Sequence, residues 1–348
     1  MIKLLSIIIP TYNMEAFLDK CLSSLILENK EDRESLDVII VNDGSKDKSL
    51  EIAQSYERQY PEMFSVIDKV NGNYGSCINA ALPRVKGKYV RILDADDSYY
   101  TENLIEYLHN LAKQDVDMIL NDYITVDSKD NVINTNRYNI PSGKKISFNT
   151  MPDNMVFAMH AVAYRSSIFK EIDYFQTEGV SYTDMEWIFH PLTSVRTIFY
   201  YAKPIYRYLL GRDGQTVDTL TMIKRLDHRE KGLWSELKIF NSLSKCNLAY
   251  KYLERMIHRR IIFIYINGLS THSNFDLNSF DNRLKQNSPY FYNRLADFTT
   301  KTGIGNFNVP IVKIWRRYRN RGLMLLHPLY AVYVLTKIIR SICSRQRH

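Results

Sequence analysis

Cysteine is scarce in this sequence, and the glycine-rich loops that hold phosphates in several nucleotide-binding folds are missing. The four cysteines among the 348 residues, Cys21, Cys77, Cys246 and Cys343, lie far apart and form no C-x-x-C pair. This spacing argues against a disulfide framework or a zinc site and predicts a cytoplasmic protein. Neither G-x-G-x-x-G nor G-x-x-x-x-G-K-S/T occurs, which argues against a dinucleotide oxidoreductase and a P-loop NTPase.

Long apolar runs are also missing. The first one, Leu4–Ile9, stops at Pro10 and has no small-residue cleavage site after it, so we expect no secretion signal. The most apolar part of the C-terminal region, Leu323–Ile342, is interrupted by Pro328 and Lys337. Its longest charge-free stretch falls short of the ~20 residues that a membrane-spanning helix needs.

Acidic residues are absent from the last 48 positions, which carry ten Lys or Arg. Residues 1–300 therefore hold 36 basic and 38 acidic side chains, although the whole chain has a net charge of +8. A nearly neutral body with a cationic tail is not typical of a nucleic-acid binder, so we expect no nucleic-acid partner.

The tail has the pattern of an amphipathic helix from about residue 309. Ile311, Ile314, Trp315 and Tyr318 fall at i, i+3, i+4 and i+7, with basic residues on the other faces. Such a helix predicts peripheral contact with an anionic surface, here the cytoplasmic face of the cell membrane. The alternative is that the C-terminal helices pack on the catalytic domain or form an oligomer.

The first ~125 residues alternate short apolar strands with segments of helical period, such as Glu15–Leu27. The expected strands are Leu4–Ile9, Leu36–Val41, Phe64–Val70, Tyr89–Leu93 and Asp117–Val126. This alternation predicts βαβ units and an α/β fold with a mostly parallel sheet. A hairpin turn is expected at Ser128–Asn131. From about 219 the chain is mainly helical, so we place a domain boundary near 218.

Three short polar segments stand out in this sequence, and each has two interpretations. Asp94-Ala95-Asp96-Asp97 could hold Mg²⁺ or Mn²⁺, or could cap a helix near Thr101. Asp43-Gly44 could bind a base or ribose, or could simply form a turn. Thr183 could cap a helix that carries Asp184 and Glu186 in its first turn, and these acids could act as a base or only favour the helix dipole.

Taken in order, these pieces resemble the family 2 glycosyltransferases, whose catalytic domain has the GT-A fold. The resemblance covers about residues 1–215. It rests on Ser6–Asn13 with Glu15, on Asp43-Gly44-Ser45 with Asp47, on Asn71-Gly72, Asn79 and Gly87, and on Asp94–Asp97. Within the family, Tyr182-Thr183-Asp184 and Tyr206-Arg207-Tyr208 look like the bacterial surface-polysaccharide branch.

The resemblance implies a catalytic domain at 1–218, with a donor half at about 1–126 and an acceptor half at about 127–218, before a helical region at 219–348. It also implies an inverting enzyme that moves a hexose from a UDP-sugar to a glycan or lipid-linked acceptor in capsule, exopolysaccharide or other cell-surface glycan synthesis. The alternative is a non-catalytic, membrane-associated scaffold of a polysaccharide assembly complex. Loss of Asp96 or Asp184 would signal a scaffold, and both are present.

Donor-binding roles are implied residue by residue. Pro10, Thr11 and Tyr12 would line the uridine pocket, Asp43 would accept the uracil N–H, and Asn71 would lie near the base or ribose. Asp94 would sit by the ribose and the metal, and Asp96 would be the main ligand of Mn²⁺ or Mg²⁺.

Two departures from the family pattern affect the other roles. Asp184 takes the place of the catalytic carboxylate, but Thr183 stands where a Glu usually precedes it, so Glu186 is the second candidate base. Ile78 stands where the family often has an Arg before the Asn. The missing cationic contact to the diphosphate or acceptor could come from Arg207 or Arg212, whose alternative role is in surface ion pairs.

Overall fold

The computed structural model describes residues 2–152, 154–212, 219–269, 273–301 and 308–319. The chain divides into two compact units. Unit 1 comprises residues 1–215 with 242–253, and unit 2 comprises residues 216–241 with 254–348. The boundary near 218 and the division into donor and acceptor halves stay predictions.

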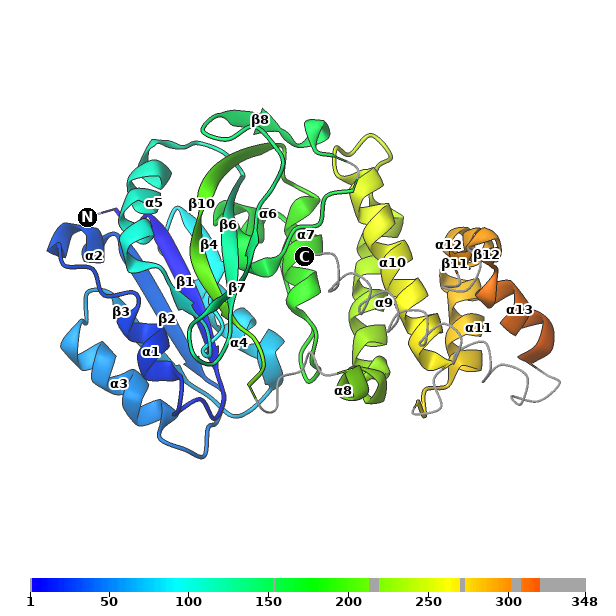
Figure 1. Ribbon diagram of the computed structural model, residues 1–348, viewed down its shortest axis with the longest axis horizontal. Helices are drawn as coiled ribbons and strands as arrows, with labels where there is room; N and C mark the ends of the chain where they lie inside the picture. Colours follow the sequence, from blue (N-terminus) through cyan, green and yellow to red (C-terminus); the bar gives the residue numbers. More distant parts are fainter. Residues whose placement is uncertain (1, 153, 213–218, 270–272, 302–307, 320–348) are drawn as a thin grey trace. The chain divides into compact units, whose positions relative to one another are not determined.

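Unit 1 is built on a mixed sheet (Figure 1). Its strands follow the order β3-β2-β1-β4-β9-β6-β10-β5. Its N-terminal part consists of β1 (Leu5–Thr11), β2 (Leu36–Asn42), β3 (Phe64–Asp68) and β4 (Tyr89–Ile92). These strands pair with one another in parallel, as predicted. The chain runs outward from β1 to β3 and returns to β4 on the other side of β1, so the strand order reverses between β1 and β4. Open α/β sheets bind ligands at such a reversal, at the carboxyl ends of the strands.

Helices cover both faces of these strands, which explains why β1 and β2 are apolar almost throughout. One face packs against α1 (Leu18–Ser23), α3 (Ser49–Gln59) and α5 (Thr101–Lys113). The opposite face packs against α4 (Asn73–Ala81), and Tyr164 there contacts Trp187 of α7 (Asp184–Leu192). Two shorter helices, α2 (Lys30–Glu34) and α6 (Ser167–Glu171), precede β2 and follow β9.

The second half of the sheet is less regular. The strands are β5 (Ser98–Tyr99), β6 (Met118–Val126), β7 (Val132–Asn136), β8 (Lys145–Ser147), β9 (Val162–Arg165) and β10 (Thr197–Leu209). β9 runs antiparallel to β4 and β6, whereas β10 runs parallel to β6 with two irregularities between Tyr201 and Tyr206. The turn predicted at Ser128–Asn131 is confirmed, because β6 and β7 form an antiparallel hairpin there.

Several predicted boundaries were wrong by a few residues. β1 continues two residues past Ile9 to Thr11, because its hydrogen-bonded ladder with β2 extends to Asn42. β3 ends at Asp68 rather than Val70. The helical period over Glu15–Leu27 corresponds to a much shorter α-helix, α1, because the residues before Leu18 form the loop beside the site.

The described part of unit 2 is mainly helical, as predicted, and contains a short strand pair that the sequence did not suggest. The elements are α8 (Thr219–Lys224), α9 (Leu226–Ser242), α10 (Tyr250–Gly268), α11 (Leu277–Asn287), α12 (Pro289–Arg294), β11 (Thr300–Lys301), β12 (Asn308–Val309) and α13 (Ile311–Tyr318). Helices α9 and α10 each have one end in residues 242–253, which belong to unit 1.

The predicted amphipathic helix is α13, but its apolar face is buried within unit 2. Ile311 and Trp315 are at most 2% exposed, and the Trp315 ring packs against Tyr265 of α10. Two of its basic residues point inward as well, because Arg316 and Arg319 pair with the fully buried Asp281 at 2.8 and 2.6 Å. The described part of the tail therefore packs within the C-terminal helical region itself, while packing on the catalytic domain and oligomer formation stay predictions.

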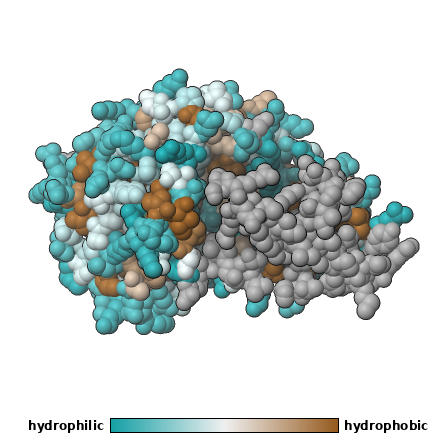
Figure 2. Space-filling view, viewed as in Figure 1, coloured by the Kyte–Doolittle hydropathy of each residue, from teal (hydrophilic) through white to brown (hydrophobic). Residues whose placement is uncertain are grey.

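No helix in the described ranges combines the length and apolar character needed to cross a membrane. The predicted apolar segment Leu323–Ile342 lies outside the described residues. On the face shown in Figure 2, hydrophobic residues of unit 1 occur in small groups among hydrophilic ones. The large exposed apolar side chains of unit 1 are accordingly scattered over different elements, with Val70, Val132 and Phe175 as examples.

Candidate functional site

Carboxylates gather where β4 ends, next to the end of β1. Asp94 accepts a hydrogen bond at Oδ1 from the Tyr74 hydroxyl (2.8 Å), and its own N–H donates to the Tyr206 hydroxyl (3.1 Å). Burial, with the neighbouring charge of Asp96, raises the pKa of Asp94 to about 7, and Asp184 of α7 adds to this effect. The loop after β4 and the start of α7 therefore bring their carboxylates close enough to interact.

Asp96 faces a cation of the chain itself. Its Oδ2 pairs with Nε of Arg212, and its side chain is 11% exposed. The same guanidinium group lies over the Phe17 ring, 5.6 Å from the centroid. A positive group beside Asp96 offsets part of the repulsion between the neighbouring carboxylates.

Asp97 does not cap a helix, so that alternative is wrong. Helix α5 begins at Thr101 with Tyr100 at the N-cap position and no side-chain cap. The Asp97 side chain turns instead to β10, where it accepts hydrogen bonds from the Tyr206 hydroxyl (2.6 Å) and the Leu209 N–H (2.7 Å). Burial and the charges of Asp96 and Asp94 raise its pKa.

The structure adds His160 to this cluster. One ligand atom each from Asp94, Asp97 and His160 lies within 4.8 Å of the others. Burial and the nearby Arg91 lower the pKa of His160 to about 3, so its ring is neutral at ordinary pH and able to coordinate. The second carboxylate oxygens of Asp94 and Asp96 have no hydrogen-bond partner within the described ranges. Oxygen-rich donors with one imidazole fit a hard divalent cation such as Mg²⁺ or Mn²⁺.

Asp43 lies at the end of β2, as predicted, and is 3% exposed. Its Oδ1 pairs with Lys69 Nζ at 2.7 Å and accepts the Gly72 N–H at 2.9 Å, while the Asn71 amide donates to the Asp43 carbonyl. The chain bends at Gly44, whose φ of +71° lies in the left-handed region, while the nucleotide-binding role of Asp43 stays a prediction. Asp43 and Asn71 thus form one polar cluster on the loop side of β2.

The residues at the end of β1 differ in how far they are exposed to solvent. Thr11 is buried and its hydroxyl donates to the Ile9 carbonyl, whereas Tyr12 is 46% exposed and Pro10 is half-buried. The next motif residues interlock two loops, because Asn13 bonds to the Ser45 hydroxyl and to the Lys46 N–H. These motif residues therefore hold the loop after β1 against the loop after β2.

The two acids of α7 have different environments. Asp184 is the first residue of the helix and is half-buried. Glu186 is fully buried, and its Oε2 accepts the Thr177 N–H at 2.8 Å. The Thr183 side chain does not cap the helix, because its hydroxyl accepts a hydrogen bond from Gln176 instead. Glu186 and Gln176 thereby fix the loop that leads into α7.

Arg207 and Arg212 separate in the structure. Arg212 joins the carboxylate cluster through Asp96, whereas Arg207 pairs with Asp130 of the β6–β7 turn at 3.1 Å and stacks over the Tyr100 ring. The ion-pair alternative thus describes both residues, but only Arg212 pairs with a carboxylate of the site.

Sequence reasoning missed how four side chains hold the cluster. Tyr206 stood within a quoted motif and Tyr74 two residues after Asn71-Gly72, yet nothing in the pattern showed that their hydroxyls would contact Asp94 and Asp97. His160 had no signal at all. Arg91 looked like one charge in a strand, but it is fully buried, with its guanidinium bonded to Asn121 and to the His160 carbonyl.

Comparison with known proteins adds a family and a fold. Residues 6–173 match the model described as Glycosyl transferase family 2. The uncharacterized glycosyltransferase MG025 homolog of Mycoplasma pneumoniae is 30% identical over 218 residues, which cover 61% of this chain and 70% of that protein.

Solved structures with a similar fold include proteins with a bound nucleotide or nucleotide sugar. TarS 1-349 of S. aureus in complex with UDP has a TM-score of 0.62 at 17% identity and covers 94% of this chain and 91% of that one. Its complex with UDP-GlcNAc has a TM-score of 0.55 at 19% identity, covering 84% and 80%. The mannosyltransferase PcManGT of Pyrobaculum calidifontis, with GDP-Man and Mn²⁺, has a TM-score of 0.51 at 13% identity, covering 83% and 82%.

The hydroxyl of Tyr206 joins β10 to the loop after β4, and its contribution to stability can be tested. Tyr206→Phe removes the donor to Asp97 and the acceptor of the Asp94 N–H. Because both groups are left in a buried site, we expect a loss of about 1–3 kcal/mol in the free energy of unfolding, measured by urea denaturation.

Tyr99→Phe is the matched control. Tyr99 lies opposite Tyr206 across the β5–β10 pair, and within the described ranges its hydroxyl has no hydrogen-bond partner. It should cost well under 1 kcal/mol. Equal losses in the two variants would mean that the hydroxyl of Tyr206 does not hold the cluster.

Proposed function

Since the chain belongs to the family 2 glycosyltransferases and has their GT-A fold, we propose that it is an inverting hexosyltransferase that uses a UDP-sugar. The observation that carries the proposal is the meeting of Asp94, Asp96 and Asp184 at the strand ends, where their charges interact. Carboxylates in this arrangement can bind a cation, and one of them can act as a base. A cation that stabilises the departing diphosphate and a base that activates the acceptor both promote sugar transfer from a nucleotide-diphosphate sugar.

We assign the donor nucleotide to the loops after β1 and β2. The complexes of TarS with UDP and UDP-GlcNAc support a UDP-sugar. Tyr12 offers an exposed ring, and the pairing of Asp43 with Lys69 makes the polar floor on which Asn71 sits. Pro10 and Thr11 complete the uridine pocket in this assignment, with Asp94 next to the ribose.

We assign Mn²⁺ or Mg²⁺ to Asp96 and Asp94, each of which has a carboxylate oxygen with no partner within the described ranges. When bound, the ion would neutralise the charge that develops on the departing diphosphate. Arg212 already provides a fixed positive charge beside Asp96. It is the better of the two arginines for a diphosphate contact, because it lies beside a proposed metal ligand, whereas Arg207 pairs with Asp130 of the β6–β7 turn.

Asp184 is our candidate for the catalytic base. It removes the proton from the acceptor hydroxyl, which then attacks the anomeric carbon from the face opposite UDP. Glu186 suits this role less well, because it is fully buried and holds the Thr177 N–H. A positioned base contributes ~10²–10⁴-fold to such a step.

The acceptor is proposed to be a glycan or a lipid-linked sugar, supplied during capsule, exopolysaccharide or other cell-surface glycan synthesis in the cytoplasm. Peripheral attachment to the inner face of the membrane would bring the enzyme to a lipid-linked acceptor. Since Arg316 and Arg319 are paired with Asp281, this attachment relies on the five Lys or Arg of residues 320–348.

Asp184→Asn tests the function and the base together. The amide keeps the shape but cannot take the proton, so UDP release in the presence of acceptor should fall ~10²–10⁴-fold while UDP binding is retained. The wild-type protein is first incubated with a panel of UDP-sugars, Mn²⁺ and lipid-linked acceptors, and UDP is measured.

Glu186→Gln is the companion variant, and a thermal melt separates lost stability from lost chemistry. If Asp184→Asn stays active while Glu186→Gln is folded but inactive, then Glu186 and not Asp184 is the catalytic base. A wild-type protein that turns over none of the UDP-sugars would favour the non-catalytic scaffold.

Asp96→Asn tests the metal assignment. Ligands that bind only the folded state raise its melting temperature, so millimolar Mn²⁺ with UDP should stabilise the wild type but not the variant. Metal-dependent transfer should fall roughly 100-fold or more. Asp115→Asn, at an exposed carboxylate before β6, is the control and should respond like the wild type. A variant that keeps the full Mn²⁺ effect would remove Asp96 from the metal site.

Truncation after Arg319 tests membrane attachment while keeping α13 and its pairs with Asp281. Each basic residue near an anionic surface can add about 1 kcal/mol at low salt. The full chain should sediment with phosphatidylglycerol vesicles and be released from them at high salt, and it should not sediment with phosphatidylcholine vesicles. The truncated chain should stay in the supernatant. Equal sedimentation of both chains, or of neither, would contradict the attachment.

A further inference from the structure

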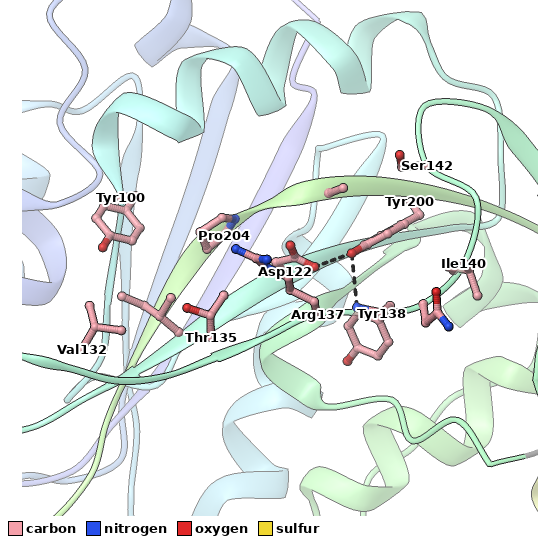
Figure 3. Close-up of a pocket in the computed structure, with 13 residues that line it drawn as sticks. Tyr100, Asp122, Val132, Thr135, Arg137, Tyr138, Ile140, Ser142, Tyr200 and Pro204 are labelled. Atoms are coloured by element: carbon pink, nitrogen blue, oxygen red, sulfur yellow. Dashed lines mark hydrogen bonds between the residues drawn. The ribbon is translucent and has the colours of Figure 1, made fainter. Parts of the chain in front are cut away.

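A cavity of about 680 Å³ lies along β6 and β10 of unit 1, outside the carboxylate cluster. Its size falls within the range of small-molecule sites. The strand residues Asp122, Tyr200 and Pro204 line one part of it, and the segment after β7, with Arg137 and Tyr138, lines another (Figure 3).

The floor of this cavity is the buried, hydrogen-bonded carboxylate of Asp122. Asp122 is 2% exposed, and its Oδ1 accepts the Tyr200 hydroxyl at 2.5 Å. The Tyr138 N–H donates to the same hydroxyl at 3.2 Å, which fixes the ring of Tyr200 over the floor (Figure 3). Burial raises the pKa of Asp122, although Tyr200 and the charge of Arg137 oppose the rise. A buried carboxylate in a cavity wall is costly unless polar groups satisfy it.

Arg137 supplies the complementary charge. Its side chain is exposed, and within the described ranges the structure records no hydrogen bond or ion pair for its guanidinium group. Asp122 and Arg137 are the only charged residues of the lining, so the cavity has no net charge. It offers hydrogen-bond acceptors and donors together, with Asn139, Thr135 and Ser142 adding further polar groups.

Aromatic and aliphatic groups complete the lining. Tyr100 and Tyr138 present rings, and Ile124, Val132 and Pro204 present apolar surface. A tyrosine ring packs against C–H groups while its hydroxyl binds polar atoms. Alternating C–H faces and hydroxyl groups are the surface of a sugar ring, which such a lining complements.

We propose that this cavity is a second carbohydrate subsite, which holds a neutral sugar unit of the acceptor glycan away from the point of transfer. The inference rests on the proposed function, since it takes the acceptor to be a glycan. A nucleotide diphosphate or another anion would place its charge beside the buried Asp122, so the balance of charge favours a neutral ligand.

The strands connect this subsite to the carboxylate cluster. Pro204 lines the cavity, and Tyr206, two residues further along β10, binds Asp97 and Asp94. β10 is irregular there, but two residues span at most roughly 7 Å even when fully extended. Arg207 then stacks on Tyr100 of the cavity wall. A glycan of several units could therefore occupy the cavity and present another unit to the transfer site.

The test measures binding in the absence of donor. Maltohexaose, cellohexaose and chitohexaose are titrated onto the full-length protein by saturation-transfer NMR and calorimetry. We expect at least one to bind, and we expect Arg137→Ala and Asn139→Ala each to weaken that binding about tenfold, because each removes a hydrogen-bonding group from the lining. Arg58→Ala, at an exposed arginine of α3, should bind like the wild type, and a thermal melt confirms that all variants fold.

Three outcomes would overturn the proposal: no binding of any of the three oligosaccharides, binding unchanged in both cavity variants, or competition by inorganic phosphate at equal concentration. UDP release from UDP-sugars by the wild type is measured separately, without oligosaccharide. A protein that turns over UDP-sugars but fails the binding test loses only the subsite. A protein that passes the binding test but turns over no UDP-sugar loses only the proposed transferase activity.

Discussion

The crowding of carboxylates at the end of β4 is the constraint on which the site depends. Asp97 is buried and Asp94 is half-buried beside Asp96, and desolvation together with mutual repulsion raises the pKa of both groups. The protein offsets this cost with polar groups from distant elements, namely Tyr74 of α4, Tyr206 and Leu209 of β10, and Arg212. The compensation is partial, which leaves a site suited to a cation.

Hydrogen bonds between loops and strands also determine the architecture around the cluster. Asp97 joins the loop after β4 to the end of β10, so the irregular half of the sheet is held against the parallel half. On the other side, Asn13 and Ser45 lock the loops after β1 and β2 together, and Glu186 anchors the loop before α7. Several motif residues therefore act as scaffolding that positions the few side chains available for chemistry.

The basic C-terminal region shows how one pattern can serve two purposes. The spacing of Ile311 and Trp315 among basic residues is typical of an interfacial helix. In unit 2 the apolar face meets Tyr265, and Arg316 and Arg319 neutralise the fully buried Asp281. A buried carboxylate needs such partners, and this requirement accounts for two of the charges that suggested a membrane.

The sequence by itself determined the alternation of strands and helices, the strand ends that carry Asp43 and Asp94, and the start of the helix at Asp184. These features follow from hydrophobic periodicity and local turn chemistry, which act between near neighbours in the chain. Only the tertiary structure decided that Asp97 binds β10, that Glu186 is buried while Asp184 is not, and that His160 joins the carboxylates. The Asp97 and His160 outcomes join residues tens of positions apart, and Glu186 meets Thr177 nine positions away across a loop. A single sequence has no local signal for such pairs. The cavity with Asp122 as its floor belongs to the same class, because it exists only where β6, β10 and the segment after β7 fold against one another.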